Sequence, residues 1–268
     1  FKSFYPVEKS IGQVVLFKGC SGELFDHAAL SDSIRLLNAC GYNVVLPDDS
    51  SCCGAIKLRQ GDAQGQRTLE HETTRSLEPW LADSQAIVVL NNSCAGQLRE
   101  YGQLSENEES SQKIIAEKTI SKKTRDIVAF LFETLKTSNV QFAPLDETVL
   151  LHISCSLKNV LKEVDLLAHL LERIPEIRLK KLNDQFCCGA AGSYMLSYPD
   201  VANRLLDDKI EDVVQQEGQL IVSSNLGCTL HFKQGLEKRG KTIEVIHPVR
   251  LLARQLIKDP FIEESKSP

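Results

Sequence analysis

The residues of this chain best suited to chemistry are its cysteines, nine among 268 residues. Four of them form two Cys-Cys-Gly triplets, and each triplet has one lone cysteine before it and another after it. Each cysteine of the second set follows its counterpart in the first set by 134 or 135 residues. The first set is Cys20, Cys52, Cys53 and Cys94, and the second is Cys155, Cys187, Cys188 and Cys228. This repeat predicts an internal duplication in which each half presents four thiols to one site.

Four thiols that meet are typical of a metal site. The opening FKSFYPVEKS lacks the apolar core of a signal peptide, and in a reducing compartment such cysteines more often bind metal than form disulfides. By count the set suits structural zinc or a [4Fe-4S] cluster equally well. Zinc sites usually draw on two CxxC knuckles, whereas each set here has one adjacent pair and two distant cysteines. We therefore predict one iron-sulfur cluster in each half, with zinc, or a strained disulfide within the adjacent pair, as alternatives.

Two further residues lie near these sets. Cys40 has no cysteine counterpart, because Pro175 stands at the matching place, and we interpret it as a buried apolar residue at the end of a helix. His231 follows Cys228 by three residues. Its imidazole is either an additional ligand of the second site or a group that only forms a hydrogen bond nearby.

The elements that must position the cysteines can be predicted from short apolar runs rich in Val, Ile and Leu, which read as buried strands. Each of the three cysteine-bearing segments in either half follows such a run. The runs cover residues 13–17, 43–47 and 86–90 in the first half and 148–153, 176–182 and 219–224 in the second.

Helical patterns follow most of these segments. Apolar residues spaced along 157–171 form one face of a single helix, and another helix is expected from Pro199 to just before Gly218. Alternating strands and helices predict a parallel sheet, with all four cysteines of a set beyond the carboxyl ends of strands, where open sheets bind ligands. The chain is thus predicted to be an α/β protein of two tandem Rossmann-like domains with parallel sheets, related by internal duplication.

The boundary between the halves is expected near residue 140. A polar stretch over 105–123 reads as a connector, and the apolar segment DIVAFLFETL that follows reads as a helix buried between the domains. The first cysteine-rich domain, with its connecting helix, then covers residues 1–140, and the second covers 141–268.

Composition excludes several classes of partner. A net charge of −5 and a pI near 5.8 argue against nucleic acid, and no apolar run approaches the roughly 18 residues needed to span a membrane. We expect a cytoplasmic protein without a membrane span.

No GxSxG, P-loop, GxGxxG or acid–base pair occurs, so no catalytic residue is predicted. We interpret His152 and His247 as structural histidines, and the small residues of GAAGSY as a place where backbone amides approach a cluster sulfur.

The motifs also carry a family resemblance. CCGAI with NNSCAGQLREYG, and HISCSL with QFCCGAAGSYMLSYPDVANRLLDDKI and SSNLGCTLHF, resemble the cysteine-rich domains of the iron-sulfur subunit of bacterial glycolate oxidase. Related domains occur in lactate-utilisation proteins, anaerobic glycerol-3-phosphate dehydrogenase and heterodisulfide reductase. The resemblance implies an electron-relay subunit, peripheral at the inner face of the membrane through its complex. A flavoprotein subunit would supply electrons, and a quinone or another carrier would accept them.

Two departures from these families leave alternatives open. The glycolate oxidase subunit begins with a ferredoxin-like domain, which is missing here, so either the chain is part of a longer protein or the ferredoxin is a separate subunit. Heterodisulfide reductase repeats end in CxxC, where this chain has Gln97 and His231. The alternative functions are a heterodisulfide-reductase-like thiol–disulfide enzyme and a zinc-stabilised interaction module.

Overall fold

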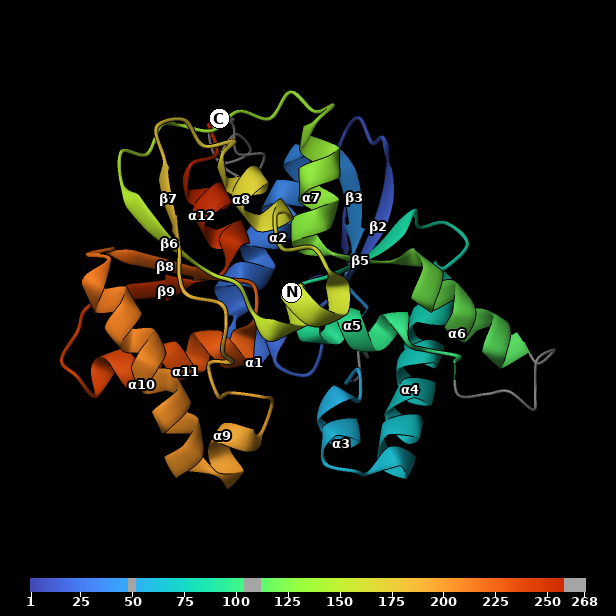
Figure 1. Ribbon diagram of the computed structural model, residues 1–268. Helices are drawn as coiled ribbons and strands as arrows, with labels where there is room; N and C mark the ends of the chain where they lie inside the picture. Colours follow the sequence, from blue (N-terminus) through green and yellow to red (C-terminus); the bar gives the residue numbers. More distant parts are fainter. Residues whose placement is uncertain (48–51, 104–111, 258–268) are drawn as a thin grey trace. The chain divides into compact units, whose positions relative to one another are not determined.

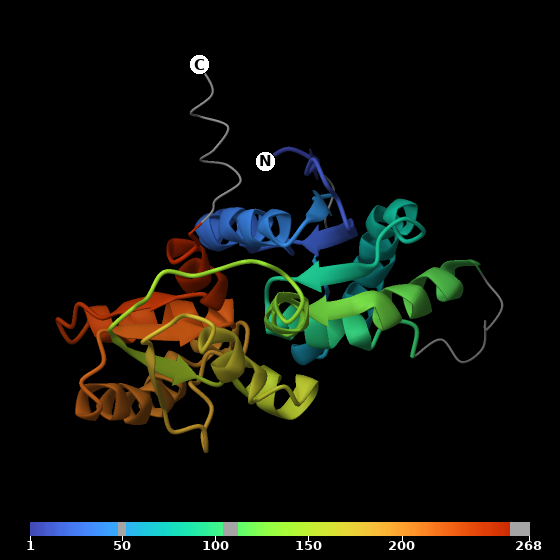
Figure 2. The ribbon, with the colours of Figure 1, turned by 90° about the horizontal axis from the view of Figure 1, so that it is seen from above.

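The computed structural model describes residues 1–47, 52–103 and 112–257, which fall into two compact units, residues 1–139 and 140–257. Each unit is an α/β layer structure built on one sheet, and the two are seen from two directions in Figures 1 and 2. Among the described helices, none combines the length and apolarity that crossing a membrane requires.

The first unit contains a five-stranded sheet in the order β1-β3-β2-β4-β5. All neighbours in it are parallel except β1 and β3, which are antiparallel, so the prediction of a wholly parallel sheet misses one edge strand. The central strand β2 is buried because four consecutive apolar residues, 14–17, face covering layers on both sides. The strands are β1 (Phe4–Tyr5), β2 (Gly12–Phe17), β3 (Tyr42–Val45), β4 (Ala86–Val89) and β5 (Thr124–Asp126).

Helices cover this sheet and connect its strands. They are α1 (Gly22–Phe25), α2 (His27–Ala39), α3 (Ala55–Arg59), α4 (Ala63–Leu77), the short 3₁₀ helix η1 (Glu78–Trp80), α5 (Asn92–Arg99), α6 (Gln112–Lys123) and α7 (Ile127–Leu135). Cys40 is the C-terminal cap of α2 and is buried, as predicted.

The connector predicted over 105–123 is wrong from residue 112 onwards, because helix α6 occupies 112–123. This helix packs against α4 and α5 through only a few buried apolar residues, among them Ile114 and Ile120. Such a sparse apolar face in a Lys-rich segment gives no clear helical pattern in sequence. Residues 105–111 lie outside the described residues. The buried helix expected in DIVAFLFETL is present as α7, which packs on β4 and β5, and its position between the domains stays a prediction.

The second unit repeats this arrangement with a four-stranded parallel sheet in the order β7-β6-β8-β9. The same order, second-first-third-fourth, is found in β3-β2-β4-β5, which confirms the internal duplication. The strands are β6 (Thr148–His152), β7 (Arg178–Lys181), β8 (Leu220–Ser223) and β9 (Glu244–Ile246). The helices are η2, a π-helix (Ser156–Leu161), α8 (Leu166–Leu171), α9 (Tyr194–Ser197), α10 (Pro199–Gln215), α11 (Leu226–Glu237) and α12 (Pro248–Arg254).

The single helix predicted over 157–171 is wrong, because the chain breaks into η2 and α8. Lys162 adopts a left-handed conformation, with φ of 58°, and ends the first turn of helix. Helix α10 begins at Pro199 as predicted and ends at Gln215, so Gly218 lies beyond its cap. A Cβ at Gly218 would collide with the Leu150 side chain of the neighbouring strand, which explains the glycine.

Candidate metal centres

In the first unit the four predicted ligands follow three neighbouring strands. Cys20 comes after β2, the pair Cys52 and Cys53 comes after β3, and Cys94 lies in the first turn of α5 after β4. Because β3, β2 and β4 are adjacent and parallel, their carboxyl ends meet at one edge of the sheet.

The thiols of this first set are linked by hydrogen bonds. Those from Cys20 and Cys53 lower the pKa of Cys52 to about 3, and the backbone amide of Gly54 acts in the same direction. The same interaction with Cys52 raises the pKa of both Cys20 and Cys53, and Cys53 also interacts with Cys94. Cys52 is therefore the thiol that ionises most easily among these three, and hydrogen bonds from its neighbours stabilise its thiolate. The thiolate is the form of cysteine that binds metal ions.

The second unit repeats this network. Hydrogen bonds from Cys155 and Cys188 lower the pKa of Cys187 to about 2. The Sγ atoms of Cys188 and Cys228 lie 3.0 Å apart, and this contact lowers the pKa of Cys228 to about 6, with His152 contributing in the same direction. The structure thus brings together the four cysteines of each predicted set.

The cysteines of each set differ in solvent exposure, so each set has an exposed side and a buried side. Cys20 and Cys155 are exposed, whereas Cys53, Cys188 and Cys228 are buried. All nine cysteines lie in the described part of the chain, and all are free thiols. Each set therefore has a side shielded from solvent and a side that solvent or a partner protein can reach.

The backbone after each cysteine pair is shaped by glycine. Gly54 and Gly189 have φ of 84° and 85°, a left-handed conformation that favours glycine. In the second unit this turns the amide of Gly189 toward Cys187, and it donates a hydrogen bond to Sγ at 3.3 Å. Within the segment GAAGSY, the Gly189 amide thus lies against the sulfur of a predicted ligand, and the approach of backbone amides to a cluster sulfur stays a prediction.

Surrounding polar groups hold the site backbone in place. In the first unit the Tyr101 hydroxyl donates a hydrogen bond to the Cys53 carbonyl at 3.0 Å, and Thr73 Oγ1 donates one to the Cys52 carbonyl at 3.1 Å. In the second, the Asn225 side chain caps α11 by accepting a hydrogen bond from the Cys228 amide at 3.1 Å.

The three histidines considered from sequence have different surroundings. His231 is buried, and its Nδ1 lies 2.9 Å from the Cys188 carbonyl oxygen, a hydrogen bond that positions the ring. His247 caps α12 by accepting from the Val249 amide, so its structural role is confirmed. His152 lies with Cys188 and Cys228 in a buried group whose ligand atoms are all within 4.8 Å of one another. Sequence reasoning missed this proximity, and the available signal was its place three residues before Cys155.

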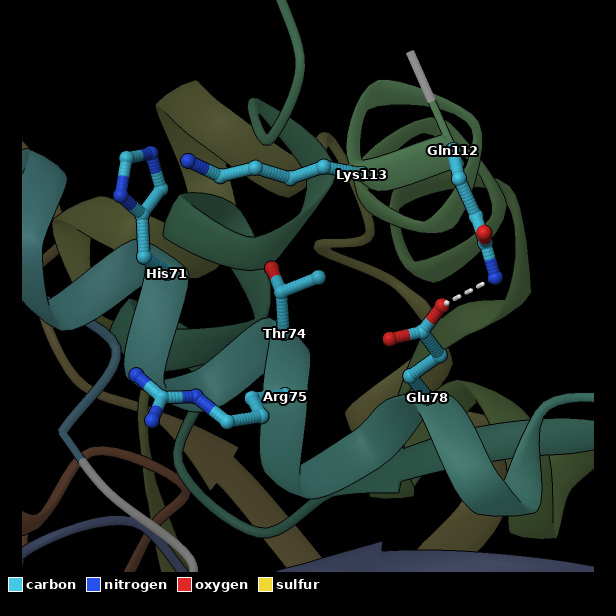
Figure 3. Close-up of a pocket in the computed structure, with 6 residues that line it drawn as sticks. All are labelled: His71, Thr74, Arg75, Glu78, Gln112 and Lys113. Atoms are coloured by element: carbon cyan, nitrogen blue, oxygen red, sulfur yellow. Dashed lines mark hydrogen bonds between the residues drawn. The ribbon is translucent and has the colours of Figure 1, made fainter.

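A separate pocket lies beside helices α4 and α6 of the first unit, with a volume of about 470 Å³. Figure 3 shows its lining, in which a hydrogen bond of 3.5 Å joins Gln112 to Glu78. Every lining residue is polar or charged, unlike the mostly apolar walls of small-molecule sites. The lining residues are His71, Thr74, Arg75, Glu78, Gln112 and Lys113. The pocket contains no cysteine, so we separate it from the metal chemistry.

Two duplicated α/β units, each with four thiols gathered beyond its strands, define a tandem cysteine-rich protein. The chain belongs to the cysteine-rich domain family CCG, whose model matches residues 14–99 and 149–233. It is 27% identical over 240 residues to lactate utilization protein A of Shouchella clausii, covering 89% of this chain and 98% of the relative. The protein of the same name from Geobacillus kaustophilus is 26% identical over 241 residues, covering 90% and 98%.

A solved structure supports the fold. A hypothetical protein from Helicobacter pylori matches 99% of this chain with a TM-score of 0.56 and 10% sequence identity. The chain spans only about half of that protein, 53% of its length. The predicted relation to lactate-utilisation proteins is confirmed, whereas membership of a glycolate oxidase complex stays a prediction.

Proposed function

We propose that this chain is an iron-sulfur electron-transfer subunit of a flavin-dependent 2-hydroxy-acid dehydrogenase complex. The observation that carries the proposal is the gathering of four thiols, twice, with one thiol of strongly lowered pKa in each set, Cys52 and Cys187. The names of the relatives favour lactate over glycolate as the acid to test first.

The donor set fits an iron-sulfur cluster. Thiolates are the usual ligands of such clusters, and amide hydrogen bonds to the sulfurs, such as that from Gly189 to Cys187, tune their potentials. A bound cluster supplies one-electron chemistry that amino-acid side chains cannot. The chain itself holds the sulfurs in place, excludes water on the side of Cys53 and Cys188, and supplies no acid or base for a substrate.

The exposure of one cysteine in each set favours an electron-transfer centre over a purely structural zinc site, because structural zinc sites are usually closed. Cys20 and Cys155 lie at the surface, so an electron donor or acceptor can approach each site directly. We propose a flavoprotein subunit as the donor, and a ferredoxin-like domain or subunit, a quinone or another carrier as the acceptor. A cytoplasmic location, with attachment to the inner face of the membrane through the complex, follows from that role.

The test is metal analysis of anaerobically purified protein. Two [4Fe-4S] clusters correspond to about eight iron and eight acid-labile sulfide per chain. Cys52→Ser and Cys187→Ser should each remove about half of both, whereas Cys40→Ala, outside both sets, should remove none. Stoichiometric zinc without iron would overturn the redox assignment in favour of an interaction module.

The role in a complex is tested separately. The natural complex, purified through this subunit, should contain a flavoprotein and oxidise lactate or glycolate with transfer of electrons to a quinone analogue. Activity on neither acid would overturn the proposed substrate class. Reduction of an added disulfide by the isolated chain would instead favour the thiol–disulfide enzyme.

A further inference from the structure

In the described part of the chain, one ring nitrogen of His152, Nε2, is buried without the hydrogen-bond partner that such an atom needs. This residue ends strand β6 and is 2% exposed. Its Nε2 atom is buried and forms no hydrogen bond with the described residues. Because an unsatisfied buried polar atom is destabilising, the arrangement indicates a partner that the polypeptide does not provide.

The surroundings of the imidazole indicate the chemistry of that partner. The thiols of Cys188 and Cys228 lie with it in one group whose ligand atoms are all within 4.8 Å of one another, and all three residues are buried. The ring of Phe232 packs edge-on at a centroid distance of 4.8 Å and fixes the orientation of the imidazole. Two thiols and an imidazole on the buried side of the set are ligands suited to iron or zinc.

The duplication provides an internal comparison. The offset of 135 residues that relates Cys155 to Cys20 also relates His152 to Phe17. These two residues end corresponding inner strands, β6 and β2, of their sheets. Phe17 is also buried, but a phenyl ring cannot bind a metal. The first unit therefore offers four thiols, while the second offers four thiols and an imidazole at the corresponding place.

We propose that His152 is a ligand of the second metal centre, on its buried side beside Cys188 and Cys228. This inference rests on the proposed function and deepens it, because it makes the two centres chemically different. As a ligand in place of one thiolate, the imidazole removes a negative charge from the centre, and such a replacement raises the potential of iron-sulfur centres. The second centre thus accepts an electron more readily than the first, which gives the relay a direction from the first unit to the second.

The experiment uses the whole chain, purified anaerobically with ¹⁵N-histidine, and measures nitrogen hyperfine coupling in the pulsed EPR spectrum of the reduced centres. His152→Phe copies the residue of the first unit at this place. His231→Gln is the matched control, because it copies Gln97 in the same way and removes a histidine whose hydrogen bond within the described part of the chain is to the Cys188 carbonyl. The first centre, which lacks a histidine counterpart, serves as the internal reference.

We expect ¹⁵N coupling in the unaltered chain and in His231→Gln, and its loss in His152→Phe, together with a lower midpoint potential of the second centre. Coupling that persists in His152→Phe, or is missing from an iron-loaded unaltered chain, overturns the ligand assignment and leaves the proposed function standing. An unchanged midpoint in His152→Phe overturns the direction of the relay.

If His152→Phe loses its metal or does not fold, the variant His152→Cys decides the test, because it returns a ligand atom to the same place. Recovery of the second centre supports the proposal, and failure to recover overturns it. If the unaltered chain holds zinc and no iron, the proposed function fails on its own. Zinc X-ray absorption spectroscopy then tests whether His152 is a ligand. Loss of a nitrogen shell in His152→Phe supports the assignment, and an unchanged shell overturns it.

Discussion

The amide of Gly189 donates a hydrogen bond to Sγ of Cys187 at 3.3 Å, and this contact depends on the left-handed backbone of the glycine. The close packing of helix α10 adds a second constraint. A Cβ at Gly189 would lie 2.5 Å from the carbonyl oxygen of Ala202. The turn that presents the second cysteine pair is therefore restricted to glycine by conformation and by space.

Gly189→Ala should destabilise the second unit by more than the about 1–2 kcal/mol that a left-handed alanine costs, because the methyl group also displaces α10. The measurement is the free energy of unfolding from urea titration. Gly240→Ala is the control, since Gly240 has a φ of 62° but nothing within 4 Å of its Cβ position, so only the conformational cost remains. Equal losses in the two variants would contradict the steric argument.

Tyr101→Phe removes the buried hydroxyl that donates to the Cys53 carbonyl. The carbonyl is left without this partner, so the free energy of unfolding should fall by about 1–2 kcal/mol. We expect the iron of the first centre to be lost faster in air, while that of the second is unaffected. Tyr198→Phe alters a tyrosine that is 59% exposed and serves as the control. Unchanged unfolding and unchanged iron loss in Tyr101→Phe would rule out this supporting role.

Cys40 should react far more slowly than the exposed Cys155 in the folded, metal-free chain. Burial raises its pKa to about 12, so only about one molecule in 10⁴ carries the thiolate at pH 8. Iodoacetamide followed by peptide mass analysis should leave Cys40 unmodified in the folded chain and modify it after urea is added. Modification of Cys40 at the rate of the exposed Cys155 would show that the end of α2 opens readily.

His71 predicts a pH dependence of stability in the first unit. Burial, with the positive charges of Lys113 and Arg67, lowers the pKa of His71 below the usual 6.5, so the native state binds fewer protons than the unfolded state. Its contribution to stability is complete above pH 6.5 and is lost as the pH falls below that value toward the native pKa. This side chain lines the pocket in Figure 3.

The test for His71 compares urea midpoints at pH 5.5 and 7.5. His71→Gln should reduce the loss of stability between pH 7.5 and pH 5.5, because glutamine does not titrate. His169→Gln changes an exposed histidine of the second unit and should leave that loss as it is. An identical pH response in His71→Gln and the unaltered chain would exclude the mechanism.

The sequence by itself determined the duplication, the α/β class and the two cysteine sets, because these depend on residue types at fixed spacing and on short apolar runs. Six strand segments could be predicted for the same reason. The edge strand β1 and the short strands β5 and β9 could not, since two or three residues carry too little pattern. Helix α6 and the break at Lys162 depend on packing and on one left-handed residue, which local propensity does not encode.

Only the tertiary structure decided which chemistry surrounds each set of thiols. The sequence predicts a structural role for His152 because the residue lies within an apolar run, and its place three residues before Cys155 is a weak signal of the site. Its proximity to Cys188 and Cys228 arises where β6, the turn after β7 and the start of α11 meet, across separations of 36 and 76 residues. Contacts over such distances in sequence are set by how the strands are ordered in the sheet, so residue spacing predicted the ligand sets but not the groups that complete and tune them.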